Sequence, residues 1–200
     1  MWDLILVRFA MTLFSRFEDA RNLWMLRYLK ALAEYRLKFQ PGGPEVLLQL
    51  SDDGSPKPFR LYRIDLASGA VSPPNLTEVN LDSVPDYPSE CFVFATGVRV
   101  TLEPFHWNGV EFAVRKPIVD VSALAEWCTH WLDVSESNPT DQNGLLGAIH
   151  SVTNPERRGD ATFFSVDFGT AQVAAVEALL KVLVGAGASD IRIASSWART

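Results

Sequence analysis

The order of strand-like and helix-like segments in the last ninety residues constrains the fold of this chain most strongly. These segments are expected, in chain order, at 110–115 (strand), 120–131 (helix), 145–152 (strand), 161–168 (strand), 171–184 (helix) and 190–194 (strand). Right-handed crossovers in such a β-α-β-β-α-β order place both helices on one face of a single antiparallel sheet. We therefore expect strands 110–115 and 161–168 to be neighbours.

The helix expected at 171–184 is apolar on nearly all sides, which predicts heavy burial. Its apolar residues are Val173, Ala174, Val176, Leu179, Leu180, Val182 and Leu183. Thr170 is expected to cap its start, and Gly185 and Gly187 to provide its exit. For the preceding helix, Asp120 or Ser122 is the expected cap.

The element order predicts an α+β fold whose C-terminal region, residues 91–200, is a ferredoxin-like split β-α-β antiparallel sandwich. Residues 1–90 are expected to add an N-terminal helix and a β-hairpin. One interlocked domain over 1–200 is the alternative to two separate units, because a chain of 200 residues suits either. The N-terminal half is expected to cover the sheet face that the two crossover helices leave open.

The N-terminal helix is predicted from Ser15, because Ser15-Arg16-Phe17-Glu18 has the pattern of a capping box. An apolar stripe recurs at helical spacing through Phe17, Ala20, Trp24, Tyr28, Ala31 and Tyr35. Pro41-Gly42-Gly43-Pro44 is expected to end the helix. The apolar run 4–10 is too short for periodicity to distinguish a buried strand from the first turns of a helix.

Strands are expected at 45–50 and 59–66, joined by the turn-rich segment 51–56, and at 91–95 and 98–102. Residues 67–90, with four prolines, predict an irregular connection. Asn108-Gly109 is typical of a tight hairpin turn, so 98–107 and 110–118 are expected to pair antiparallel.

The charge distribution is uneven, although the net charge is only −6. Residues 1–40 carry seven Lys or Arg against four Asp or Glu, whereas residues 77–141 carry eleven acids against three cations. An acidic middle segment repels phosphate backbones, which argues against nucleic acid as a partner. It fits either a solvated surface that aids solubility or the binding of a basic protein.

The residues that usually carry chemistry are few and scattered. Cys91 and Cys128 are too few for a disulfide framework or a cysteine-based zinc site, and both are expected to be packed thiols. His106, His130 and His150 lack metal-ligand spacing, so no metal or cofactor is expected. The N-terminus lacks the basic start and cleavage site of a signal peptide, and no stretch approaches the ~18 apolar residues of a membrane span, so the cytoplasm is the expected location.

Several short motifs resemble known sites but lack the required context. Asp167-Phe168-Gly169 lacks the other kinase motifs, Gly185-Ala186-Gly187 closes a helix instead of opening one, and Arg158-Gly159-Asp160 is expected at a hairpin tip. No Gly-x-Ser-x-Gly elbow is present. These motifs are interpreted as turns and core.

The strand alternation predicts a polar patch around one aromatic ring on the sheet. The candidate ligand or partner surface consists of Glu111, Arg115, His150, Phe163, Ser165 and Asp167. His150 shares its strand face with Leu146, Ala148 and Val152. Coverage of this sheet face by the N-terminal half, with its charges paired, is the structural alternative.

Three functional hypotheses follow. The favoured one is a non-enzymatic protein-binding module with a basic partner, possibly of the immunity type that inhibits a toxin, because charge complementarity speeds capture. The second is a small enzyme with a dispersed site of His150, Asp167 and Glu111. The third is a small-ligand sensor, which would need a closed apolar pocket and could dimerise through an edge strand.

Overall fold

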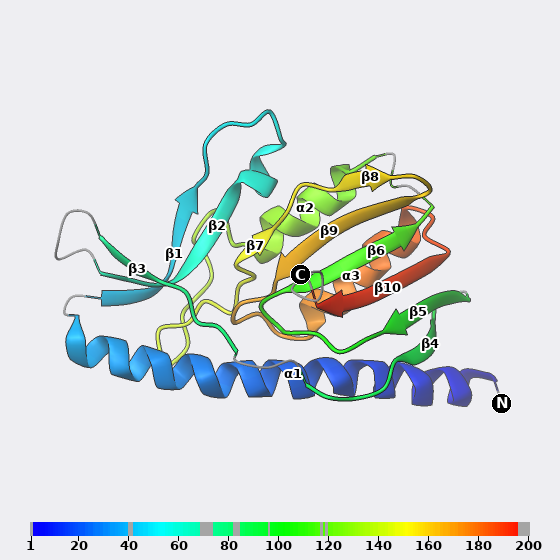
Figure 1. Ribbon diagram of the computed structural model, residues 1–200, viewed down its shortest axis with the longest axis horizontal. Coiled ribbons are helices and arrows are strands. Elements are labelled where there is room, and N and C mark those ends of the chain that lie inside the picture. Colours follow the sequence, from blue (N-terminus) through cyan, green and yellow to red (C-terminus); the bar gives the residue numbers. More distant parts are fainter. Residues whose placement is uncertain are drawn as a thin grey trace.

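The computed structural model is a mixed α+β fold with three α-helices and one large, mostly antiparallel sheet (Figure 1). It describes residues 2–39, 42–68, 74–81, 85–95, 97–116, 118 and 120–195, with side chains from Leu13 onward outside the undescribed positions. The elements are α1 Trp2–Lys38, β1 Gly42–Gln49, a 3-10 helix Lys57–Arg60, β2 Leu61–Ser68, β3 Asn75–Thr77, β4 Glu90–Phe94, β5 Val98–Leu102, β6 Val110–Arg115, α2 Ser122–Trp131, β7 Ser151–Val152, β8 Glu156–Arg158, β9 Ala161–Asp167, α3 Ala174–Gly185 and β10 Asp190–Ser195.

The sheet runs without interruption in the order β1-β2-β7-β9-β6-β10-β5-β4. β3 adds to β2, and β8 adds to β9. β5 and β10 pair parallel, while the other strand pairs are antiparallel. The coarse prediction of an α+β fold is therefore correct, whereas the division of the chain near residue 90 stays a prediction.

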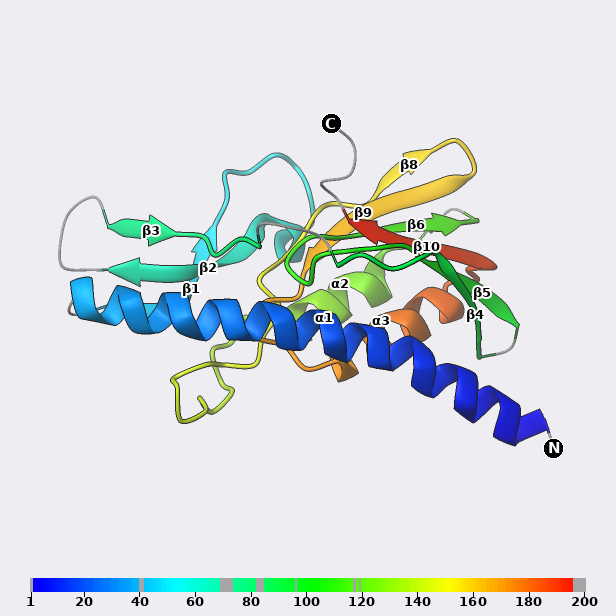
Figure 2. The same ribbon diagram turned by 60° about the horizontal axis from the view of Figure 1, so that its bottom comes forward.

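The expected neighbours β6 and β9 do pair, with Val110 opposite Val166 and Phe112 opposite Phe164. Phe112 and Phe164 stack with ring centroids 5.2 Å apart, and Phe112 lies against Phe168, which contacts Trp127 of α2. The helices α2 and α3 cover this face of the sheet (Figure 2). The two helices also contact each other, since the Trp127 indole N–H donates to the Ala175 carbonyl. As predicted, α3 buries most of its apolar residues against this face.

The strand predicted at 145–152 is wrong for most of its length, because only Ser151 and Val152 are in strand conformation. The backbone amides of the preceding residues bind other partners than a neighbouring strand. The Leu146 amide donates to the Glu45 carboxylate, and the Ile149 amide donates to the last carbonyl of α2, that of Trp131. The segment is thus pinned to two different elements and cannot join a regular ladder.

The hairpin predicted across Asn108-Gly109 is also wrong. A local turn exists there, with a bridge between His106 and Gly109, but β5 and β6 do not pair. Instead β10 lies between them, parallel to β5 and antiparallel to β6. The central position offers β10 hydrogen bonds on both edges, which a two-stranded hairpin would not provide.

Helix α1 starts well before the predicted cap at Ser15 and runs to Lys38. The residues before Ser15 include Leu, Met, Ala and Phe, so helical structure continues through them. At 37 residues the helix is about 55 Å long and extends along the molecule (Figure 1). The predicted stripe is buried at Phe17, Ala20, Trp24, Tyr28 and Tyr35, with Leu32 in place of the half-buried Ala31. None of the described helices is long and apolar enough to cross a membrane.

The N-terminal hairpin forms as predicted, with Val46 opposite Ile64 and Gln49 opposite Leu61. It does not cover the open sheet face, however. It extends the sheet beyond β7, while α1 lies on the same side of the strands as α2 and α3 (Figure 2). The face predicted to be covered by the N-terminal half is therefore turned away from all three helices.

Candidate functional site

Five of the six predicted surface residues lie on this open face, which we call the outer sheet face. The register places Glu111 opposite Ser165 and Arg115 opposite Ala161, so the alternating residues Phe163, Ser165 and Asp167 share the face of Glu111 and Arg115. The remaining predicted residue, His150, lies elsewhere.

Most charges on the outer sheet face have partners nearby. Arg192 binds Glu103 through two contacts of 2.5 and 2.6 Å. Arg115 lies 3.8 Å from Asp160, and the Arg158 guanidinium lies 5.3 Å from the centre of the Phe163 ring. These are the features of a solvated, charge-balanced sheet surface.

His150 points to the helix-covered side and is 1% exposed. Its ring lies between two carboxylates, with Nε2 3.1 Å from Glu45 Oε1 and Nδ1 2.8 Å from Asp65 Oδ1. The second contact has the distance of a hydrogen bond without the alignment of a linear N–H···O bond. The rings of Trp24 and Tyr28 pack against the imidazole with centroids 6.0 and 6.3 Å away.

Glu45 approaches His150 from β1 in an unusual backbone conformation. Its φ of 56° lies in the left-handed region that non-glycine residues seldom adopt. The carboxylate accepts hydrogen bonds from the Leu146 amide at 2.5 Å and from the Thr170 hydroxyl. The hydroxyl of Thr170, predicted to cap α3, is thus used by this cluster instead.

Asp65 reaches the other side of the His150 ring from β2. Its second oxygen accepts the Val79 amide at 2.6 Å, and its backbone carbonyl accepts the Tyr28 hydroxyl at 2.8 Å. Together, Glu45, Asp65, His150 and Thr170 form what we call the His150 cluster. The charge of Asp167 also acts on its ring.

The proton affinities in the cluster are shifted strongly. Burial by itself would lower the pKa of His150, but contacts with Asp65 and Glu45 and the charge of Asp167 raise it well above 6.5. Burial raises the pKa of Asp167 to about 7, although the charge of His150 opposes this increase; Asp65 adds a smaller increase. Loss of hydration, together with the neighbouring Asp65 and Asp167, raises the pKa of the surface residue Glu78 to about 8.

Arg63 fixes the surroundings of the cluster without binding its carboxylates. Its guanidinium is buried and donates to three backbone carbonyls, those of Glu45, Leu132 and Asp133, at 2.7 to 2.8 Å. It lies 3.6 Å from the exposed carboxylate of Glu136. One side chain therefore ties β1 to the end of α2.

The cluster is suited to hold protons and is poorly placed to meet a substrate. Gly169, Trp24 and Tyr28 close around the ring of His150. Only Thr170, at the far side of Glu45, lines an open cavity of about 250 Å³. Among the side chains that the structure describes, no three His, Cys, Asp or Glu residues are arranged to hold a metal ion.

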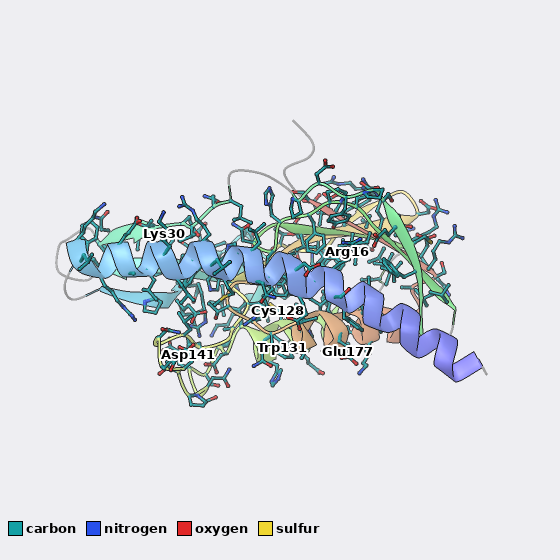
Figure 3. All side chains as sticks on the ribbon, turned by 90° about the horizontal axis from the view of Figure 1, so that it is seen from below. Arg16, Lys30, Cys128, Trp131, Asp141 and Glu177 are labelled. Carbon is teal, nitrogen blue, oxygen red and sulfur yellow. The ribbon has the colours of Figure 1, made fainter. Side chains whose placement is uncertain are left out.

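A second feature is an acidic surface formed by α2 and the loop that follows it. Residues 117–156 contain no Lys or Arg, and Asp120, Glu126, Glu136 and Asp141 are all exposed. Other acids of the predicted acidic segment are neutralised, since Glu90 binds Arg16 and Glu103 binds Arg192. Figure 3 shows Asp141 and the half-buried Trp131 on the side of the molecule seen from below. We call Asp120, Glu126, Glu136 and Asp141 the acidic surface.

The sequence did not single out Glu45, Asp65 or Glu78, and it assigned Thr170 to a helix cap. One available signal was the pair Arg63 and Asp65, two charged residues that point the same way inside an apolar strand. A charged residue in a buried strand needs a partner, and this requirement indicates a polar cluster without identifying its other members.

Comparison with protein-family models, with curated proteins and with solved structures finds no match to this chain.

Proposed function

We propose that this chain is a protein-binding module whose partner is basic and docks on the acidic surface. The supporting observation is that residues 117–156 contain no Lys or Arg, and that α2 and the loop after it expose Glu126, Glu136 and Asp141, with Asp120 exposed just before the helix. Exposed acidic side chains attract an oppositely charged protein and accelerate its capture.

Two further features support docking at this place. Trp131, the last residue of α2, is half-buried and lies on the side of the molecule that also carries Asp141 (Figure 3), and tryptophan is among the residues that contribute most to protein interfaces. The best-formed set of titratable groups, the His150 cluster, is closed to solvent, which favours a role in folding over a role in chemistry. An immunity-type inhibitor that captures a basic toxin fits this combination.

The test is affinity purification from the native host with wild-type protein and with a paired-charge variant, Glu126→Lys with Glu136→Gln. Both side chains are exposed, so the variant is expected to fold. Wild type should retain a basic partner in constant proportion, with the affinity falling as salt rises. The variant should lose that partner.

A matched control places the same change of charge on the outer sheet face, with Glu111→Lys and Asp160→Asn. If the partner docks on the acidic surface, this control binds it like wild type. Loss of binding only in the control would move the interface to the outer sheet face, which contains Glu111, Arg115, Phe163, Ser165 and Asp167. Recovery of no partner, or binding indifferent to both variants, would contradict the proposal.

A small enzyme is the second candidate, because His150 and Asp167 of the predicted dispersed site are near enough for the charge of each to shift the pKa of the other. Glu111, the third predicted member, lies on the outer sheet face. Access to the ring of His150 would require Gly169 or α1 to move. For the ligand-sensor hypothesis, the most apolar hollow described, lined by Gly42, Val46, Leu48, Ala67 and Leu76 among others, is open to solvent.

At the level of fold, we further propose that β6, α2, β7, β9, α3 and β10 form a ferredoxin-like unit. The strand order β7-β9-β6-β10 and the position of both helices on one side support this assignment. An experimental structure in which β7 is detached from β9 would contradict it.

A further inference from the structure

The His150 cluster connects segments that are far apart in the chain. Glu45 and Asp65 come from the N-terminal hairpin, while His150 and Thr170 come from the C-terminal half. Helix α1 is also connected to the cluster, because the Tyr28 hydroxyl donates a hydrogen bond to the backbone carbonyl of Asp65. Contacts between these side chains therefore hold the hairpin and α1 against the C-terminal half.

The protonation state of the ring decides whether these contacts attract. Nε2 and Nδ1 each face a carboxylate oxygen, at 3.1 and 2.8 Å. An imidazolium presents a proton on both nitrogens, whereas a neutral imidazole presents one and turns a lone pair toward the other carboxylate. In a buried site, that lone pair and that carboxylate repel without water to screen them.

We propose that the His150 cluster is a proton-dependent clasp, which holds the N-terminal hairpin and α1 while the imidazole is doubly protonated and loosens when the proton leaves. This inference is independent of the proposed partner surface. Loss of the His150 proton would weaken the attachment of β1 and β2 to the C-terminal half, so the attachment is weaker in mildly alkaline than in mildly acidic solution.

The surroundings of His150 make the ring the central cation of the cluster. The titratable groups that face it are Tyr28 from α1, Glu45 from β1, Asp65 from β2, Glu78 after β3 and Asp167 from β9. The nearby guanidinium of Arg63 donates to backbone carbonyls. That of Arg21 donates to the Ala171 and Thr170 carbonyls.

The sign of the effect follows from the direction of the shifts. The pKa values of His150, Asp167 and Glu78 are all higher in the folded chain than in an unfolded one, so the folded state binds more protons. The contribution of His150 is fully present below about pH 6.5, the ordinary pKa of histidine, and is lost as pH rises toward its raised folded value. The contributions of Asp167 and Glu78 already fall from about pH 4, the ordinary range of carboxyl groups, up to about pH 7 and about pH 8.

The first experiment measures the unfolding equilibrium constant by urea titration between pH 6 and 9. One extra proton in the folded state makes this constant rise about tenfold per pH unit, and we expect at least that slope from wild type. In His150→Gln, the unfolding equilibrium constant should rise less steeply with pH, by one factor of ten fewer per pH unit, because glutamine does not titrate. His130→Gln, at an exposed position on α2, is the matched control and should leave the slope unchanged.

A milder variant and a direct observation keep the test decisive if His150→Gln does not fold. Glu78→Gln removes a surface carboxyl whose pKa is raised to about 8. In this variant the unfolding equilibrium constant should depend less steeply on pH below about pH 8. Nitrogen-15 NMR of wild type should show both His150 nitrogens protonated at pH 7.5. A neutral ring at that pH, or stability that does not fall from pH 6.5 to 8, would overturn the proposal.

Hydrogen exchange locates the effect. After correction for the intrinsic rate, amides of β1 and β2 should lose protection between pH 6.5 and 8.5 in wild type, while those of β5 and β10 keep more of theirs. Equal loss across the sheet would refute a clasp and indicate only global destabilisation.

Discussion

Gly169 lies directly against the ring of His150, and replacing it with alanine tests how tightly the cluster is packed. An added Cβ would lie 2.1 Å from His150 Cδ2 and 2.5 Å from Nε2, distances far inside van der Waals contact. The backbone at Gly169 also has φ of +47°, in the left-handed region that alanine adopts only at a cost. The substitution Gly169→Ala therefore combines backbone strain with a direct steric clash.

The expected loss of stability has two parts. Left-handed backbone costs an alanine about 1–2 kcal/mol. Forcing an extra carbon into a packed interior adds about 1–3 kcal/mol, because the ring of His150 is held on both sides and cannot move aside. Together we expect Gly169→Ala to lower the free energy of unfolding by about 2–5 kcal/mol.

The assay is chemical denaturation with urea, which reports the free energy of unfolding for each variant. Gly159→Ala is the matched control, because Gly159 has φ of +65° and no atom within 4 Å of an added Cβ. It should lose only the backbone part, about 1–2 kcal/mol. If both variants lose the same amount, the close packing of Gly169 on His150 is refuted.

Two other residues give independent predictions. Arg63→Met should cost at least about 3 kcal/mol in the free energy of unfolding, since three buried carbonyls lose a charged donor. Arg60→Met, which breaks only a pair with the exposed Asp52, should cost about 1 kcal/mol or less, and equal losses would contradict the role given to Arg63. The prediction of a packed thiol is wrong for Cys91, which is exposed, whereas Cys128 is buried. A thiol reagent should therefore modify Cys91 rapidly and Cys128 only after unfolding, because burial raises the pKa of Cys128 to about 12; two fast thiols would disprove this.

Much of the local structure could be predicted because its causes are local. The alternation of apolar and polar residues in β6 and β9 predicted which side chains face the helices, and the structure buries Phe112, Phe164 and Val166 accordingly. The stripe along α1 was predictable for the same reason. Periodicity depends on neighbours within a few positions, so it is visible in the sequence.

The errors arise where a local signal competes with a distant partner. Asn108-Gly109 does form a turn, but β10 supplies a better neighbour for β6 than β5 does. Ser15 fits a capping box, yet the residues before it are also helical. A local motif permits a hairpin or a helix start, and the rest of the chain decides whether it is used.

The His150 cluster shows this limit most clearly, because none of its contacts follows from spacing along the chain. Glu45 is the most informative member. A glycine would adopt its φ of 56° with little strain, whereas glutamate does so at a cost. In return the carboxylate meets the Leu146 amide, the Thr170 hydroxyl and the His150 ring. The strain at Glu45 is thus offset only if the cluster forms, which makes the N-terminal hairpin and the C-terminal half depend on each other.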